Sequence, residues 1–143
     1  MEALVALSLA GNVIQFVQFA SQVVSETQET YKSAANATYG HQDVETVAED
    51  LRQLIVPLKI SAEASAAGEE FKNLLDSCTE AANELYDALQ ELKVKSGSHS
   101  RWRSFSKALL SVWKKEQLSS FETRLFLLRD QIQFHIVEST RYG

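Results

Sequence analysis

Proline, glycine and cysteine are scarce in this sequence, and one long stretch lacks charge; each of these features narrows what the chain can be. No charged side chain occurs between Glu2 and Glu26, although 23% of the 143 residues are charged. A single proline and five glycines favour long regular elements over a loop-rich fold. The only cysteine, Cys78, excludes an intramolecular disulfide and suggests a reducing compartment. The length predicts a single domain over residues 1–143, and the hydrophobic content of 45% is that of a folded protein.

Sequence motifs of catalysis and metal binding are also missing. The histidines His41, His99 and His135 show neither H-E-x-x-H nor zinc-ligand spacing. There is no glycine-rich phosphate loop and no G-x-S-x-G elbow. Cys78 lies within a helical pattern, where a small buried thiol is favoured over a reactive one. We therefore expect no enzymatic activity, no cofactor and no metal site.

Apolar residues recur at helical spacing along the whole chain, and no stretch alternates with the period of a strand. The pattern predicts helices from near the N-terminus to about Tyr39, over about 44–58, from about Glu69 to Lys95, over 102–113, and from about Glu116 to Thr140. Gly40 and Gly97 supply stops, and Pro57 should kink or end the second helix. The predicted fold class is all-α: an antiparallel helical bundle of four long helices plus a shorter one.

Three of these helices carry a stripe that predicts one buried face each. The stripe of the second helix is Val44, Val47, Ala48, Leu51, Leu54, Ile55 and Leu58. That of the third is Phe71, Leu74, Leu75, Cys78, Ala82, Leu85, Leu89 and Leu92. In the last helix Leu118, Phe121, Leu125, Leu128 and Ile132 follow steps of three and four, a heptad seam for a neighbouring helix.

The charges are segregated along the chain. Residues 26–92 carry four basic and fourteen acidic side chains, a net charge of −10, whereas residues 93–115 carry seven basic side chains and no acidic one. The seven are Lys93, Lys95, Arg101, Arg103, Lys107, Lys114 and Lys115. Trp102 and Phe105 lie among them, as in a nucleic-acid surface, but both also fit a buried helical stripe. A solvated face and a patch for anionic lipid or a protein partner stay open, and we expect no nucleic-acid partner.

The uncharged opening stretch changes character at Gly11. From residue 12 onward the amides of Asn12, Gln15, Gln18 and Gln22 share one side of a helix, with apolar residues opposite. Before Gly11 the large apolar residues Leu4, Val5, Leu7 and Leu9 point in all directions. A secretory signal is disfavoured, because Glu2 stands where a basic region belongs and the helical pattern continues past any cleavage point.

Energetics favour a surface or oligomeric role for this stretch over a lone membrane span. Removing the four large apolar side chains before Gly11 from water is worth up to about 6–12 kcal/mol. Sinking the four amides unpaired into hydrocarbon costs roughly 8–28 kcal/mol. Several copies could pair their amides across an oligomer. Alternatively, the rest of the bundle or a further part of the protein covers the first turns.

Two segments carry a family resemblance. LSLAGNVIQFVQFASQVVSETQETYKSA resembles the N-terminus of fungal HeLo-like domains, which stand at the front of NLR-like (STAND) proteins. RWRSFSKALLSVWKKEQLSSFETRLFLLRDQIQFHI is similar to the Trp-containing helix and closing helix of the same family. The resemblance implies a helical bundle used in programmed cell death and non-self recognition. It also implies that assembly through a following nucleotide-binding domain exposes an N-terminal helix that permeabilises membranes.

Carried onto this sequence, the resemblance assigns the membrane helix to Leu4 through Ala20. Its candidate residues are Leu4, Val5, Leu7, Leu9, Gly11, Val13, Ile14, Phe16, Val17 and Phe19. The implied partners are membrane phospholipid, further copies of the chain and a C-terminal nucleotide-binding sensor domain in cis. The implied location is cytoplasmic at rest and the plasma membrane on activation.

Two other functions stay open at this point. The chain could be a helical adaptor whose apolar N-terminus docks on its own receptor or on another helical domain without touching lipid. It could also be a regulatory helical domain of a biosynthetic or transcriptional protein. The sequence stops soon after a strong helix, which suggests the N-terminal part of a longer protein.

Overall fold

The computed structural model describes residues 2–24, 42–64, 69–97, 101–102 and 105–142, with the side chains of residues 2–9, 42, 61–64, 69–71, 101–102, 106 and 138–142 left outside the description. The elements in chain order are α1 (Glu2–Val24), β1 (Gln42–Asp43), α3 (Val44–Ala64), α4 (Glu69–Ser96), β2 (Arg101–Trp102), α5 (Phe105–Leu109) and α6 (Lys115–Tyr142).

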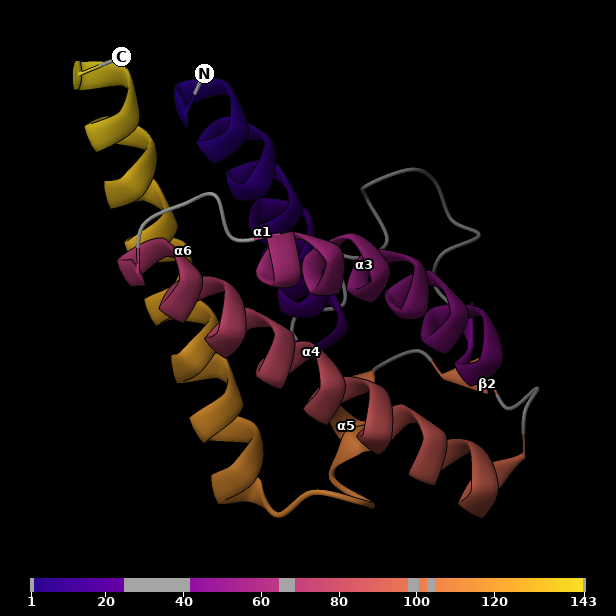
Figure 1. Cartoon of the computed structure of the whole chain (residues 1–143). Coiled ribbons are helices and arrows are strands. Elements are labelled where there is room, and N and C mark those ends of the chain that lie inside the picture. Colours follow the sequence, from indigo (N-terminus) through magenta and orange to yellow (C-terminus); the bar gives the residue numbers. More distant parts are fainter. Residues whose placement is uncertain (1, 25–41, 65–68, 98–100, 103–104, 143) are drawn as a thin grey trace.

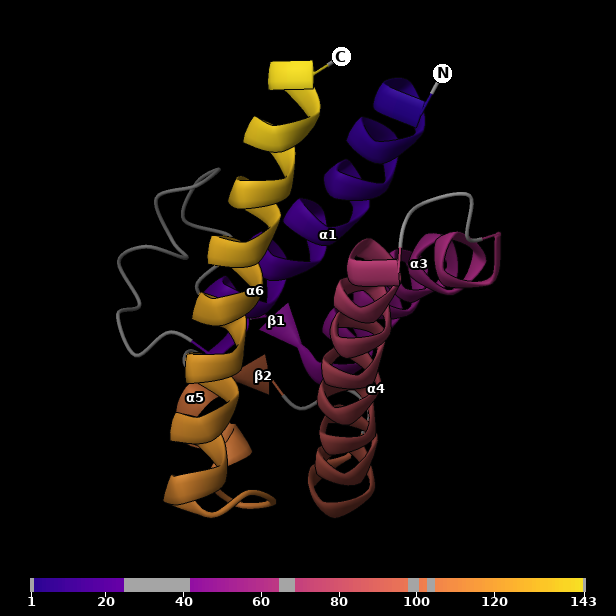
Figure 2. The same cartoon turned by 60° about the vertical axis from the view of Figure 1, so that its left-hand side comes forward.

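The four long helices form two antiparallel pairs. α1 lies beside α6 and α3 lies beside α4, and these are the two most extensive contacts between the described helices (Figures 1 and 2). α1 also packs on α3, and α4 packs on α6, which closes the bundle around one core. The short α5 contacts α1 and α4. The prediction of an all-α antiparallel bundle with four long helices and a shorter one is confirmed.

The predicted apolar stripes form this core. In α3 the buried residues are Val44, Val47, Ala48, Leu51, Ile55 and Leu58, and in α4 they are Leu74, Leu75, Cys78, Ala82, Leu85, Leu89 and Leu92. The α6 seam is buried at all five positions, Leu118, Phe121, Leu125, Leu128 and Ile132. Leu54 is only half-buried, and the side chain of Phe71 lies outside the description. Each large apolar side chain removed from water stabilises the fold by roughly 1.5–3 kcal/mol.

Local hydrogen bonds fix where the helices begin and end. The backbone N–H of Thr46 donates to Oδ1 of Asp43 at 2.7 Å, which caps the N-terminus of α3. Gly97 has a φ of 96°, and its N–H donates to the carbonyl oxygen four residues earlier at 2.8 Å. This left-handed cap, which glycine adopts without strain, ends α4 as predicted. At the start of α6 the side chain of Gln117 accepts the backbone N–H of Lys114 at 2.8 Å.

Pro57 does not end the second helix. α3 continues through it to Ala64. A proline inside a helix removes one backbone hydrogen bond and costs about 3 kcal/mol or more. Its neighbours Ile55 and Leu58 are both buried, so tertiary packing holds the helix on each side of the defect. Of the two outcomes predicted for Pro57, termination is therefore wrong.

Two further boundaries differ from the sequence prediction. Trp102 was expected to begin a helix, but it lies in β2, which pairs antiparallel with β1 so that Gln42 faces Trp102. This two-residue pairing connects the start of α3 to the segment before α5. A strand of two residues is too short to show a period-two pattern in the sequence. The helix predicted to reach Tyr39 is described as far as Val24, and residues 25–41 lie outside the described residues.

Candidate functional site

The second half of α1 is part of the hydrophobic core. Its buried residues are Ala10, Val13, Phe16, Val17, Ala20, Val23 and Val24, with Ile14 and Phe19 half-buried against them. On the opposite side Gln15 and Gln18 are exposed. The amphipathic pattern predicted from residue 12 onward is therefore confirmed. Most of the candidate membrane residues after Gly11 serve, in this structure, to hold the bundle together.

The N-terminal turns of α1 have different surroundings. They extend past α3 and α4 and lie beside the C-terminal turns of α6 (Figures 1 and 2). The structure places Leu4, Val5, Leu7 and Leu9 on the helix, and their side chains lie outside the description. One neighbouring helix covers one face of another. Among the described elements, α6 is the neighbour of these turns. The sequence of this segment is apolar on every side of the helix, but only one of those sides has a neighbouring described helix.

Gly11 marks the boundary between the two halves of α1. A Cβ atom placed on Gly11 would meet no heavy atom within 4 Å. No helix of the described bundle therefore depends on the small size of this residue for close packing. None of the helices in the described ranges combines the length and apolar character needed to cross a bilayer.

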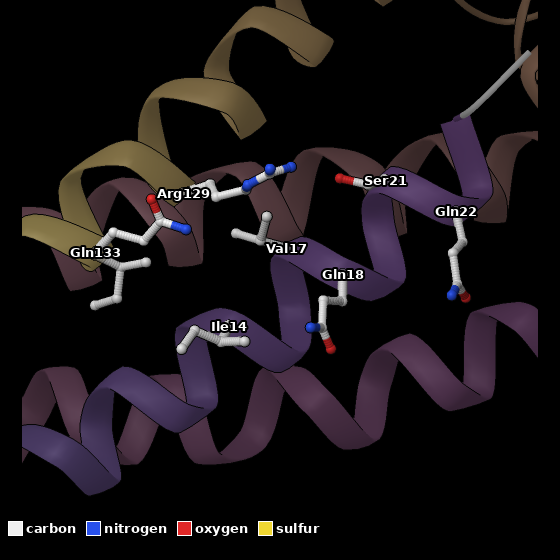
Figure 3. Close-up of a pocket in the computed structure, with 8 residues that line it drawn as sticks. Ile14, Val17, Gln18, Ser21, Gln22, Arg129 and Gln133 are labelled. Atoms are coloured by element: carbon white, nitrogen blue, oxygen red, sulfur yellow. The ribbon is translucent and has the colours of Figure 1, made fainter. Parts of the chain in front are cut away.

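A groove of about 610 Å³ lies between α1 and α6. It is lined by Ile14, Val17, Gln18, Ser21, Gln22, Arg129, Ile132 and Gln133. In Figure 3 Arg129 and Gln133 reach from α6 towards Val17 of α1. The floor is apolar and the rim carries amides and one guanidinium, so part of the polar stripe of α1 faces this groove. The sequence could not predict the groove, because it depends on which helix lies beside α1.

Two of the seven predicted basic residues are held within the fold. Nζ of Lys93 lies 3.4 Å from a carboxylate oxygen of Glu45 on α3. Nζ of Lys95 donates to the backbone carbonyl of Ser111 at 2.7 Å. Both lysines also stand in the last turn of α4, where positive charge offsets the partial negative charge of the helix end.

The remaining basic residues are only partly described. Lys107, Lys114 and Lys115 are exposed near α5 and the start of α6. The side chain of Arg101 lies outside the described residues, and so does Arg103 altogether. The structure therefore brings the described lysines to one end of the bundle.

This basic end lies opposite the N-terminal turns of α1. α6 begins near α5 and ends beside the start of α1, where both chain termini lie (Figures 1 and 2). A helix of 28 residues is about 42 Å long. Lys114 and Lys115 are therefore separated from the N-terminal turns by roughly that distance, the length of α6.

The described titratable groups offer little chemistry. Cys78 is buried, and burial raises the pKa of its thiol to about 12, so at neutral pH the thiol is protonated and a poor nucleophile. His135 is half-buried, with its ring edge-on to Phe134 at 5.9 Å. No group of three or more His, Cys, Asp and Glu side chains in the described part of the chain is placed to hold a metal ion. His41 and His99 lie outside the described residues.

Sequence reasoning missed one surface, the outward face of α6. Phe126, Leu127, Phe134 and Val137 are exposed there, on the side of the helix away from the buried seam. We call these four residues the outer stripe. A helical wheel of residues 115–142 contains the signal, because the four positions fall in one sector of about 100°. The heptad seam on the other face of α6 was the stronger apolar pattern in the same helix.

Comparison with known protein families supplies the wider setting of this bundle. A model of the SesA family, described as an N-terminal domain on NACHT NTPases and P-loop NTPases, matches residues 10–123. The chain belongs to the SesA family. This SesA domain is accordingly an N-terminal domain of the NLR-like type, as the sequence resemblance implied, while the HeLo-like subtype stays a prediction. No curated protein and no solved structure matched the chain.

The limits of the family match coincide with features of the structure. The match begins at Ala10, where the core half of α1 also begins. It ends at Thr123, before the outer stripe of α6. The matched region of this SesA domain is thus most of the buried bundle, and both the apolar N-terminal turns and the outer stripe lie beyond it.

Proposed function

We propose that this SesA domain is a non-enzymatic, HeLo-like effector of programmed cell death. It stays in the cytoplasm at rest and inserts the N-terminal end of α1 into the plasma membrane when a C-terminal nucleotide-binding sensor domain clusters several copies. The observation that carries the proposal is the uncharged start of α1, apolar on every side, on turns that extend past α3 and α4 (Figure 1). The family setting on NACHT NTPases supports the clustering.

The geometry limits what can insert while the bundle stays closed. Residues 2–9 form about 12 Å of helix, whereas the hydrocarbon core of a bilayer is about 30 Å thick. These turns can therefore anchor a closed domain in one leaflet but cannot cross both. A pore needs more of α1 than the segment before Ala10.

Releasing more of α1 requires the bundle to open. Val13, Phe16, Val17 and Val23 are buried, and exposing these four side chains costs roughly 6–12 kcal/mol. That is comparable with the whole stability of a typical domain, about 5–15 kcal/mol. In the proposal the cost is offset in a cluster, where neighbouring copies bury the apolar side of α1 and pair its amides with one another.

The basic residues have no part in insertion under this proposal. A membrane held by Lys114 and Lys115 lies at the end of the resting bundle opposite the apolar turns. Lys93 and Lys95 already have partners within the fold. The exposed lysines are better suited to a protein partner.

A liposome-leakage assay tests the proposal. The chain is fused through its C-terminus to an oligomerising coiled coil and added to vesicles that contain anionic lipid and an entrapped dye. We expect leakage from the oligomer, little from the monomer, and at least a tenfold loss with Leu4→Glu together with Leu7→Glu, because two carboxylates enter hydrocarbon at a cost of about 2.5–3.5 kcal/mol each.

The matched control is Lys114→Glu together with Lys115→Glu, which changes two exposed residues at the other end. Leakage should then stay within about twofold of the unsubstituted oligomer. Equal leakage before and after the two leucine substitutions, with circular dichroism showing both proteins folded, contradicts the proposal.

A second candidate function is an adaptor that never touches lipid. The exposed outer stripe of α6 favours the adaptor function, because apolar side chains that gather on a solvent-exposed helix face are typical of a protein-docking surface. Retention of a purified receptor domain by the immobilised chain, with no sedimentation on anionic vesicles even when oligomerised, supports this function over membrane insertion.

A further inference from the structure

The outer stripe of α6 gathers four of the large apolar side chains that are exposed among the described residues. Phe126 is 65% exposed and Phe134 is 59% exposed, with Leu127 and Val137 more than half exposed. A folded helix normally turns polar residues outward on this side. Beside Phe134 an open hollow of about 490 Å³ runs between α4 and α6. The surface is therefore suited to receive another helix.

The spacing of the outer stripe is symmetric. Phe126 and Leu127 form one apolar pair, Phe134 and Val137 form another about two turns later, and Asp130 lies between them. In an antiparallel arrangement of two α6 helices centred near residue 131, Leu127 faces Phe134 of the second copy and Phe126 faces Val137 of the second copy. Each apolar pair then meets the other, which is the self-complementarity that a twofold contact requires.

The area of the outer stripe predicts a weak contact. The four side chains together expose roughly 400 Å² of apolar surface, given that an aromatic side chain can bury about 150–250 Å². Two copies then bury about 800 Å² through the stripe, below the 1,200–2,000 Å² of a stable specific interface. Such a contact is unoccupied in dilute solution. It forms when tethering raises the local concentration to the millimolar range.

Asp130 supports the same conclusion from its charge. It is exposed, and it is the charged residue at the centre of the stripe. In the antiparallel arrangement the two Asp130 carboxylates lie close to the twofold axis, where like charges repel. Asp130 therefore weakens pairing between free domains, so that pairing requires the higher local concentration that clustering provides.

We propose that the outer stripe of α6 is a self-docking surface, through which two copies of this domain pair antiparallel along α6 when they are clustered. The proposal deepens the function above and rests on it for the source of clustering, the nucleotide-binding domain. The contact itself is a property of the chain and needs no membrane.

Sedimentation equilibrium of the chain over a wide concentration range tests the pairing. We expect weak self-association that Phe134→Glu reduces by at least tenfold and that Asp130→Asn strengthens by at least threefold. Val94→Glu is the matched control, because Val94 is 84% exposed on α4 and lies off the stripe. It adds the same charge and should leave the association constant unchanged.

Thiol cross-linking tests the orientation. Cys78 is buried, so a cysteine introduced on α6 is the accessible thiol among the described residues. Phe126→Cys and Val137→Cys chains, carrying different mass labels, are mixed at high concentration and oxidised mildly. Antiparallel pairing joins position 126 of one chain to position 137 of the other, whereas parallel pairing joins like positions.

Three results overturn the proposal. They are a chain that stays monomeric at millimolar concentration, self-association that Phe134→Glu and Val94→Glu reduce equally, and cross-links between like positions only. A stripe that serves solely to bind the nucleotide-binding domain gives the first result. Because no lipid is present, failure here leaves the leakage result standing, and failure of the leakage assay leaves this pairing standing.

Discussion

The two halves of α1 are built from similar apolar side chains but have different neighbours. After Gly11 the helix is amphipathic, with its apolar side buried against the bundle and its amides facing outward or into the groove beside α6. Before Gly11 the same helix continues past α3 and α4, with an apolar sequence on every side (Figure 2). The difference teaches that one continuous helix can serve two purposes. One half stabilises the domain, and in the function proposed above the other half meets a partner or a membrane.

The largest expected effect separates the two halves by stability. Phe16 is fully buried, so Phe16→Ala should lower the free energy of unfolding by about 3–5 kcal/mol. Leu7→Ala, in the first half, should lower it by less than about 1 kcal/mol, because those turns extend past α3 and α4. Chemical denaturation followed by circular dichroism measures both, with Gln15→Ala as an exposed control on the same helix. Equal losses at positions 7 and 16 would remove the distinction between the halves.

A second prediction concerns how well the core on the buried face of α4, where Cys78 lies, is closed to water. Burial raises the pKa of the Cys78 thiol to about 12 from an ordinary value near 9. In the unfolded chain the thiol ionises first, so its contribution to stability is complete below pH 9 and is lost as the pH rises towards 12. The loss should approach about 1.4 kcal/mol per pH unit in that window.

Comparison with Cys78→Ala isolates this contribution, because lysines and tyrosines titrate in both proteins. The difference in unfolding free energy between the two chains should shrink from pH 9 upward. A constant difference, or rapid reaction of the native thiol with an aromatic disulfide reagent at pH 8, would show that the core is open to solvent.

The smallest expected effect lies at the boundary between the halves. Gly11→Ala should stabilise the domain by about 0.5–1 kcal/mol, because alanine favours helix and its Cβ meets no heavy atom within 4 Å. Gly97→Ala should act in the opposite direction by a similar amount, since the φ of 96° at Gly97 strains any residue with a Cβ. Thermal melts of the two variants measure both signs. Destabilisation by Gly11→Ala would mean that a helix packs closely at the boundary.

The fold was predictable because periodic burial leaves a direct trace in the sequence. The α6 seam from Leu118 to Ile132 is buried at every predicted position, and Gly97 ends α4 where its backbone freedom predicts. The prediction that Pro57 could end its helix was wrong, because it considered the free-energy cost of a proline inside a helix without the tertiary packing that offsets this cost. Trp102 was misplaced, because a two-residue ladder is decided by the partner strand far along the chain.

The candidate site was less predictable, since it depends on which elements lie side by side. The change of character at Gly11 is visible in the sequence, but the groove with Arg129 is not. The basic segment is visible in the sequence, yet only the fold shows that Lys93 and Lys95 have partners and that the lysine end lies opposite the apolar turns. The outer stripe of α6 was visible in the sequence and was missed, because a single strong seam already explained the helix.

The chain enters and leaves the bundle at the same end (Figures 1 and 2). A bulky domain joined after Gly143 would lie near the first turns of α1 and could shield them by its size alone, without a dedicated contact. The length of a linker between the two domains would then set the exposure of the first turns of α1. A short linker would keep these turns shielded, and a longer one would leave them accessible. A fluorescent protein fused at the N-terminus would crowd that same end, so labels for cell work belong on the exposed surface near α5.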